Sequence, residues 1–87
     1  MSPSLKLLYF AWLREKAGVG EETVDAPQGV ATVGDLVDWL VSRGGGFAEA
    51  FTDRKVVRVA VNQEYVSFDH PVGAGDEIAF FPPVTGG

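Results

Sequence analysis

The fold is decided by residues 32–46, which read TVGDLVDWLVSRGGG. Thr32 is a good helix N-cap, and Asp35 adds negative charge to the first helical turn. Apolar side chains then recur with the spacing of one helix face, at Val33, Leu36, Val37 and Leu40. Because glycine is common just beyond a helix C-terminus, we expect residues 44–46 to end the helix. The stretch therefore predicts one main helix with a single apolar face.

Apolar and alternating segments on both sides of this helix predict five strands, over residues 5–10, 22–26, 56–61, 64–66 and 77–81. A short helix is expected over 11–17, a tight turn at 62–63 and a further helical turn over 47–51. The helix crosses between strands, so the first and last strands should be parallel neighbours in a mixed sheet. We predict an α+β fold of the β-grasp (ubiquitin-like) type over residues 1–81, with a flexible C-terminal Gly-Gly tail over 82–87.

The alternation along the strands assigns side chains to the two faces of the sheet. The helix can cover only one face, and we expect that face to carry Leu5, Leu7, Tyr9, Ile78 and Phe80. Phe10 and Phe81 then point to the opposite face and lie close together, with Tyr65 as a third ring there. Such rings can be ordinary scattered surface residues or can lie under a loop. We favour an exposed aromatic patch beside the tail, which marks a partner surface.

Composition limits the class of protein. The chain has 87 residues, of which 46% are hydrophobic, and this is enough for one domain with a core. Its net charge of −5 disfavours nucleic acid and anionic membranes as partners and favours a basic partner surface. The absence of cysteine excludes disulfides, thiolate catalysis and cysteine zinc sites. The apolar run over 7–13 is too short to span a bilayer, and charged residues follow it, so we expect a cytoplasmic protein.

Little in the body of the chain suggests catalysis. His70 is the only histidine, and although Asp69 could orient it, no nucleophile motif accompanies it, so a turn role is favoured and no metal site is expected. The carboxylate pairs at 21–22 and 76–77 are neighbours on strands and point apart, so they are interpreted as solvated charges. Residues 44–46 lie at the wrong end of a helix to bind phosphate.

The C-terminal segment is the candidate reactive element, and it consists of Pro82, Pro83, Val84, Thr85, Gly86 and Gly87. Six extended residues reach roughly 20 Å, far enough to enter another protein's active site. Prolines stiffen the exit from the sheet, and the two glycines allow passage through a narrow channel. The Gly87 carboxylate is a poor acyl donor until ATP adenylates it, and we expect a separate enzyme to do this. The alternative is a cloning scar or a random end.

Four segments carry a resemblance to a known family, and they are residues 9–15, 61–63, 67–71 and 75–87. Together they resemble the small, sulfur-carrying subunit of molybdopterin synthase. The resemblance implies that an E1-like adenylyltransferase adenylates Gly87 and that a sulfurtransferase supplies the sulfur of a thiocarboxylate. It also implies that the tail enters the large subunit of a heterotetramer and gives sulfur to precursor Z (cyclic pyranopterin monophosphate). This builds the dithiolene of molybdopterin in molybdenum cofactor biosynthesis.

The resemblance also assigns residues and limits. Gly86 and Gly87 are the implied functional end, and Phe10, Tyr65 and Phe81 fall where the family contacts its partners, although the family has an aliphatic residue at position 65. The chain is then no enzyme on its own and binds no cofactor. Three alternatives remain: a thiamine-pathway sulfur carrier, a ubiquitin-like protein modifier, and a non-covalent ubiquitin-like binding module.

Overall fold

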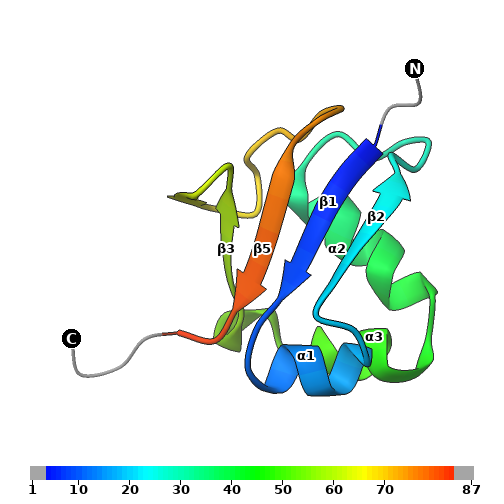
Figure 1. Ribbon diagram of the computed structural model, residues 1–87, viewed down its shortest axis with the longest axis vertical. Coiled ribbons are helices and arrows are strands. Elements are labelled where there is room, and N and C mark those ends of the chain that lie inside the picture. The colour runs from blue at the N-terminus through cyan, green and yellow to red at the C-terminus, as the bar shows by residue number, and fades with distance from the viewer. Residues whose placement is uncertain (1–3, 84–87) are drawn as a thin grey trace.

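A computed structural model describes residues 4–83 of the chain. The elements in chain order are β1 (Ser4–Tyr9), α1 (Trp12–Ala17), β2 (Glu21–Asp25), α2 (Val33–Ser42), α3 (Gly45–Ala50), the 3-10 helix η1 (Arg54–Val56), β3 (Arg58–Val61), β4 (Glu64–Val66) and β5 (Glu77–Phe81). The strands form one sheet in the order β2-β1-β5-β3-β4 (Figure 1). The first and last strands pair in parallel, and the other neighbours are antiparallel. The predicted β-grasp fold is confirmed.

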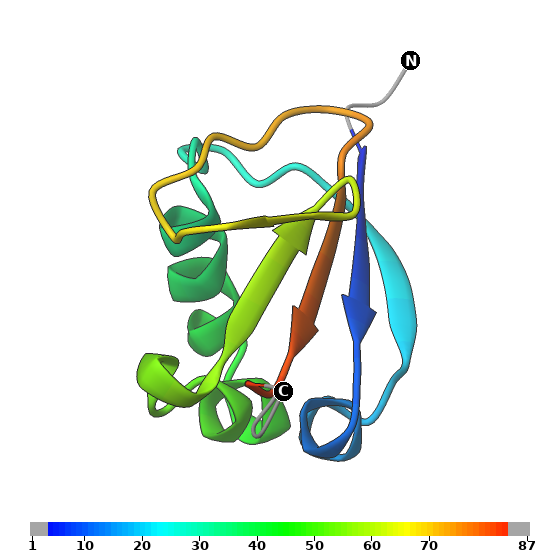
Figure 2. The same ribbon diagram turned by 90° about the vertical axis from the view of Figure 1, so that its left-hand side faces the viewer.

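The helix α2 and the sheet form two layers with the core between them (Figure 2). The predicted apolar stripe of α2 is fully buried, with 0% exposure at Val33, Leu36, Val37 and Leu40. The sheet contributes the five inward residues that the alternation predicted, which are Leu5, Leu7, Tyr9, Ile78 and Phe80. Burial of apolar area on one face of each element is the main stabilising contribution of this contact.

The start of α2 is fixed by a reciprocal cap. The Asp35 backbone N–H donates to Thr32 Oγ1 at 3.1 Å, and the Thr32 N–H donates to Asp35 Oδ2 at 3.1 Å. The Ala31 N–H donates to the same carboxylate oxygen at 3.0 Å. These backbone donors hold the pKa of Asp35 below its usual range, because they stabilise the ionised form. The capping role predicted for Thr32 is confirmed.

The glycine run after α2 has a second role that the sequence did not predict. The helix α2 ends at Ser42, but Gly44 (φ 76°) and Gly45 (φ 55°) turn the chain directly into α3. A Cβ on Gly46 would lie only 1.7 Å from the carbonyl oxygen of Lys16. The third glycine therefore allows α3 to lie directly against the end of α1. Other differences are small: β3 begins at residue 58 instead of 56, since 54–56 form η1.

We expect Gly46→Ala to lower the free energy of unfolding by about 2 kcal/mol, because α1 and α3 must separate to admit the methyl group. Urea denaturation measures this change. Gly73→Ala is the matched control, since nothing lies within 4 Å of the position of its Cβ. Equal stability of the Gly46 variant and the native chain would show that the α1–α3 contact is loose.

We also expect Asp35→Ala to destabilise the chain in a pH-dependent way. A carboxyl group whose folded pKa is lowered stabilises the fold above its unfolded pKa of about 3.9 and loses that contribution as pH falls through the folded pKa. The difference between variant and native chain should therefore be larger at neutral pH than in acid. Thermal unfolding across this range measures it, with Asp25→Ala at an exposed position of β2 as control. A difference independent of pH would contradict this account of the cap.

Candidate functional site

The last strand ends in the middle of the sheet, between β1 and β3. Tyr9 lies opposite Phe80 in the parallel register, and the Phe10 backbone N–H donates to the Phe80 carbonyl oxygen at 3.1 Å. Pro82 and Pro83 follow half-buried and outside the strand, as expected for residues without an N–H for the ladder. The remaining predicted tail residues, Val84, Thr85, Gly86 and Gly87, lie outside the described residues.

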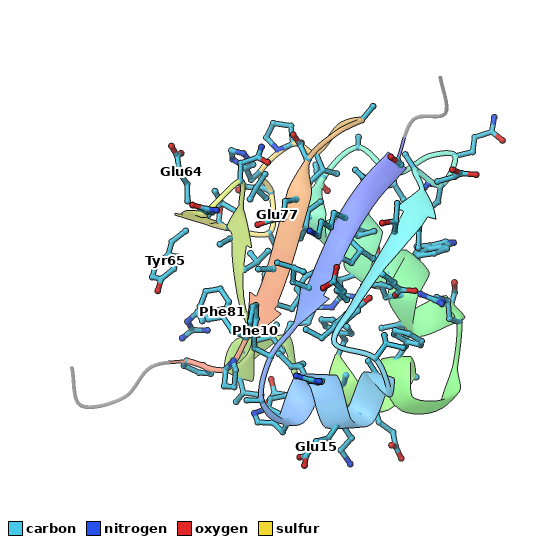
Figure 3. The ribbon with its side chains drawn as sticks, viewed as in Figure 1. Phe10, Glu15, Glu64, Tyr65, Glu77 and Phe81 are labelled. Carbon is cyan, nitrogen blue, oxygen red and sulfur yellow. The ribbon has the colours of Figure 1, made fainter. Side chains whose placement is uncertain are left out.

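Three aromatic side chains lie on the face of the sheet opposite α2, and we call them the docking face: Phe10, Tyr65 and Phe81 (Figure 3). Phe10 is 47% exposed and Tyr65 is 79% exposed, while Phe81 is half-buried. The ring centroids of Tyr65 and Phe81 are 5.3 Å apart. These two residues come from β4 and β5, so their rings meet across β3, where the small Ala60 lies opposite Tyr65. The outward orientation that the alternation predicted is confirmed.

Buried rings hold the end of β5 in place beneath the docking face. Phe80 is 0% exposed and stacks on Tyr9, with ring centroids 6.0 Å apart. Phe51, the residue that follows α3, packs edge-on against Phe80, with the ring centroids 5.0 Å apart. Aromatic pairs of this kind stabilise beyond their buried area. These core-side contacts therefore fix the position at which the chain leaves the sheet.

Sequence reasoning missed a polar cluster on the inner side. The Tyr9 hydroxyl donates to Glu22 Oε2 at 2.7 Å, and Arg43 Nη1 donates to the same oxygen at 2.8 Å. The Arg43 guanidinium also lies 4.0 Å from the ring centroid of Phe47. Burial raises the pKa of Tyr9 well above its usual range, so the hydroxyl keeps its proton. The interpretation of Glu22 as a solvated charge was wrong, because Glu22 pairs with inward-facing Leu7 in the register. The available signal was an inward tyrosine, whose hydroxyl needs a partner.

The other polar candidates are structural. The His70 N–H donates to the Ser67 carbonyl oxygen at 3.1 Å and its carbonyl oxygen accepts from the Val33 N–H at 3.0 Å, so the backbone of this residue lies in a turn. Asp69 accepts a hydrogen bond from the Ser67 hydroxyl, and Asp76 accepts from the Asn62 side chain at 3.0 Å. Within residues 4–83 no group of three or more His, Cys, Asp or Glu side chains could hold a metal ion. None of the helices in that range is long and apolar enough to cross a membrane.

The chain is similar to known proteins over nearly its whole length. The sequence pattern of the ThiS family matches residues 7–87. The molybdopterin synthase sulfur carrier subunit of Escherichia coli (strain K12) is 45% identical, over 95% of this chain and 99% of that protein. A solved structure of a putative molybdopterin converting factor, subunit 1, from Pyrococcus furiosus is 37% identical with a TM-score of 0.74, over 95% of this chain and 100% of that one.

A second solved structure carries a different name. The crystal structure of SAMP1 from Haloferax volcanii is 38% identical with a TM-score of 0.71, and the match covers 97% of this chain and 99% of that one. The family pattern extends over both the sheet and the C-terminal segment, and the sequence relative and the solved structure each match 95% of the chain. On these grounds the chain belongs to the ThiS family.

Proposed function

We propose that this chain is the sulfur carrier subunit of a molybdopterin synthase and that Gly87 carries the sulfur as a thiocarboxylate. The observation that carries the proposal is the 45% identity, over nearly all of both chains, to an Escherichia coli protein with that name. The geometry supports it, because the chain leaves the sheet beside three exposed or half-exposed rings and continues into two prolines. On this proposal the chain is a cosubstrate, and the catalytic site lies in the large subunit.

The proposed chemistry takes place at the Gly87 carboxylate. An E1-like adenylyltransferase binds ATP and converts the carboxylate into an acyl-adenylate with release of pyrophosphate. A sulfur nucleophile at the oxidation level of sulfide, supplied through a sulfurtransferase, attacks the acyl carbon and displaces AMP, which leaves the thiocarboxylate. Inside the large subunit this sulfur is transferred to precursor Z. Two such deliveries build the dithiolene.

The docking face is the proposed contact with the large subunit in a heterotetramer. Aromatic side chains are enriched at the centres of protein interfaces, and Phe10, Tyr65 and Phe81 form such a centre at the root of the tail. Pro82 and Pro83 would direct the following residues away from the sheet, and Val84, Thr85 and Gly86 would lie in the partner's channel. The cytoplasmic location stays a prediction.

One observation favours a second function. The Haloferax volcanii structure with 38% identity is named SAMP1, and a relative from the same organism is named small archaeal modifier protein 1. A modifier would use the same activated carboxylate but form an amide with an amine of another protein. The two functions therefore share the adenylation step and differ in the nucleophile that follows.

The first test is the chemical state of the C-terminus. Incubation with the E1-like enzyme, ATP, a sulfurtransferase with its sulfur donor, and a thiol that reduces the transferred sulfur to the level of sulfide should exchange one oxygen of the Gly87 carboxylate for sulfur. Intact-protein mass spectrometry detects the exchange. Omission of ATP is the control and should leave the carboxylate unchanged. Deletion of Gly87 should abolish the exchange and leave the melting temperature unchanged. An isopeptide bond to lysine in place of the thiocarboxylate would establish the modifier function instead.

The second test concerns the docking face. We expect Phe81→Glu to weaken binding to the large subunit at least about tenfold, because a charge replaces a ring at the centre of the contact. Isothermal titration calorimetry measures the affinity. Thr23→Glu is the control, since it adds the same charge on the exposed strand β2. A large loss of melting temperature for Phe81→Glu, without selective loss of binding, would contradict the assignment.

A further inference from the structure

Arg58 is a charged residue next to the docking face that the proposed function leaves without a role. It begins β3 and lies opposite Phe81 in the antiparallel register. With Val59, Tyr65, Val66 and Phe81 it lines a cavity of about 220 Å³. Four of these five residues are aromatic or aliphatic. The cavity is therefore an apolar depression with one cation in its wall, and two of the three rings of the docking face line it.

The guanidinium of Arg58 is held in place by the backbone. Its Nη1 donates to the Lys55 carbonyl oxygen at 2.9 Å and also lies 3.3 Å from the Val57 carbonyl oxygen. An arginine has five N–H donors in a planar fork, so these contacts orient the group and leave other donors available. A fixed guanidinium loses less rotamer entropy on binding than a free one.

No carboxylate neutralises Arg58 among residues 4–83. The four ion pairs in this range involve Lys6, Lys16, Arg43 and Arg54. The whole chain has twelve acidic and seven basic residues, so carboxylates are in excess. A shortage of carboxylates therefore does not explain why the guanidinium beside the apolar cavity has no ion pair. The positive charge of Arg58 is therefore available to an acidic group of a partner.

Covering this position with an apolar partner surface would be unfavourable. A buried charge without a counter-charge is strongly unfavourable, whereas a carboxylate can form two parallel hydrogen bonds with a guanidinium. We propose that the partner that covers the docking face places an acidic side chain, flanked by apolar residues, in the cavity against Arg58. The inference rests on the proposed function, which supplies the partner as the large synthase subunit.

On the proposed function, in which the tail extends into the partner, Arg58 has no direct role at the reacting sulfur. The guanidinium lies beside Phe81, and Gly87 is the sixth residue after Phe81 in the sequence. An extended segment of that length spans roughly 20 Å, so Arg58 cannot follow the tip of the tail into the active site. Its contribution is to the affinity and selectivity of docking, with the partner carboxylate at the mouth of the channel that receives the tail.

The test measures binding of the full chain to the large subunit of the same organism by isothermal titration calorimetry. Arg58→Gln should weaken binding at least about tenfold. The affinity of Arg58→Lys should lie between those of the native chain and Arg58→Gln, because lysine keeps the charge but lacks the planar fork. The native chain should also lose more affinity with added salt than Arg58→Gln. Lys55→Gln is the matched control, since it removes the same charge three positions away and leaves the backbone carbonyl that holds Arg58.

Melting temperatures of all variants separate a folding defect from a binding defect, and they should agree with the native value. If Arg58→Gln binds the large subunit as tightly as the native chain does, the inference is overturned and the proposed function stands. Equal weakening by Lys55→Gln would also overturn it, since general attraction would then explain the effect. If the native chain does not bind the large subunit, the proposed function itself fails.

Discussion

The parallel pairing of the first and last strands is the constraint on which the rest of this structure depends. The register from Lys6↔Glu77 to Tyr9↔Phe80 brings the two ends of the described chain together, although some seventy residues separate them in sequence. Parallel neighbours need a crossover, and the segment that contains α2 supplies it and covers one face of the sheet. Because β3 pairs with the other edge of β5, the C-terminal segment starts from the centre of the sheet and not from its edge. The docking face and the cavity beside Arg58 follow from this placement.

The fold was predictable where apolar residues recur along the sequence at the spacing of the buried face of a helix or strand. The α2 stripe and the alternation in β1 and β5 both report which side chains meet in the core, and both predictions are confirmed. The role of Gly46 was not predictable, since it depends on a contact with Lys16, thirty residues earlier. Glu22 was misjudged for a similar reason. Adjacent carboxylates in a strand suggest solvation, but the register places Glu22 opposite Leu7 on the inner face, where the hydroxyl of the buried Tyr9 donates to it.

The candidate site was predictable residue by residue but not as an arrangement. Alternation alone shows that Phe10 and Phe81 face away from the helix. The contact between Tyr65 and Phe81 depends on the spatial order β5-β3-β4, and the arginine beside them depends on a register that no local pattern encodes. Net charge illustrates the same limit. The excess of carboxylates favours a basic partner surface overall, whereas the local geometry at Arg58 favours a single acidic side chain.

The central position of β5 also has a mechanical consequence. A partner that grips the C-terminal segment and pulls it along the strand axis loads the hydrogen bonds to β1 and to β3 at the same time. Such shear must stretch many bonds together, whereas a strand peeled from an edge loses its bonds one by one. Phe80, held between Tyr9 and Phe51, adds a ring that would have to leave the core before the strand could slide. A pulling force on the C-terminal segment is therefore distributed over the hydrogen bonds on both sides of β5, and the β-grasp domain resists it without losing strands one at a time.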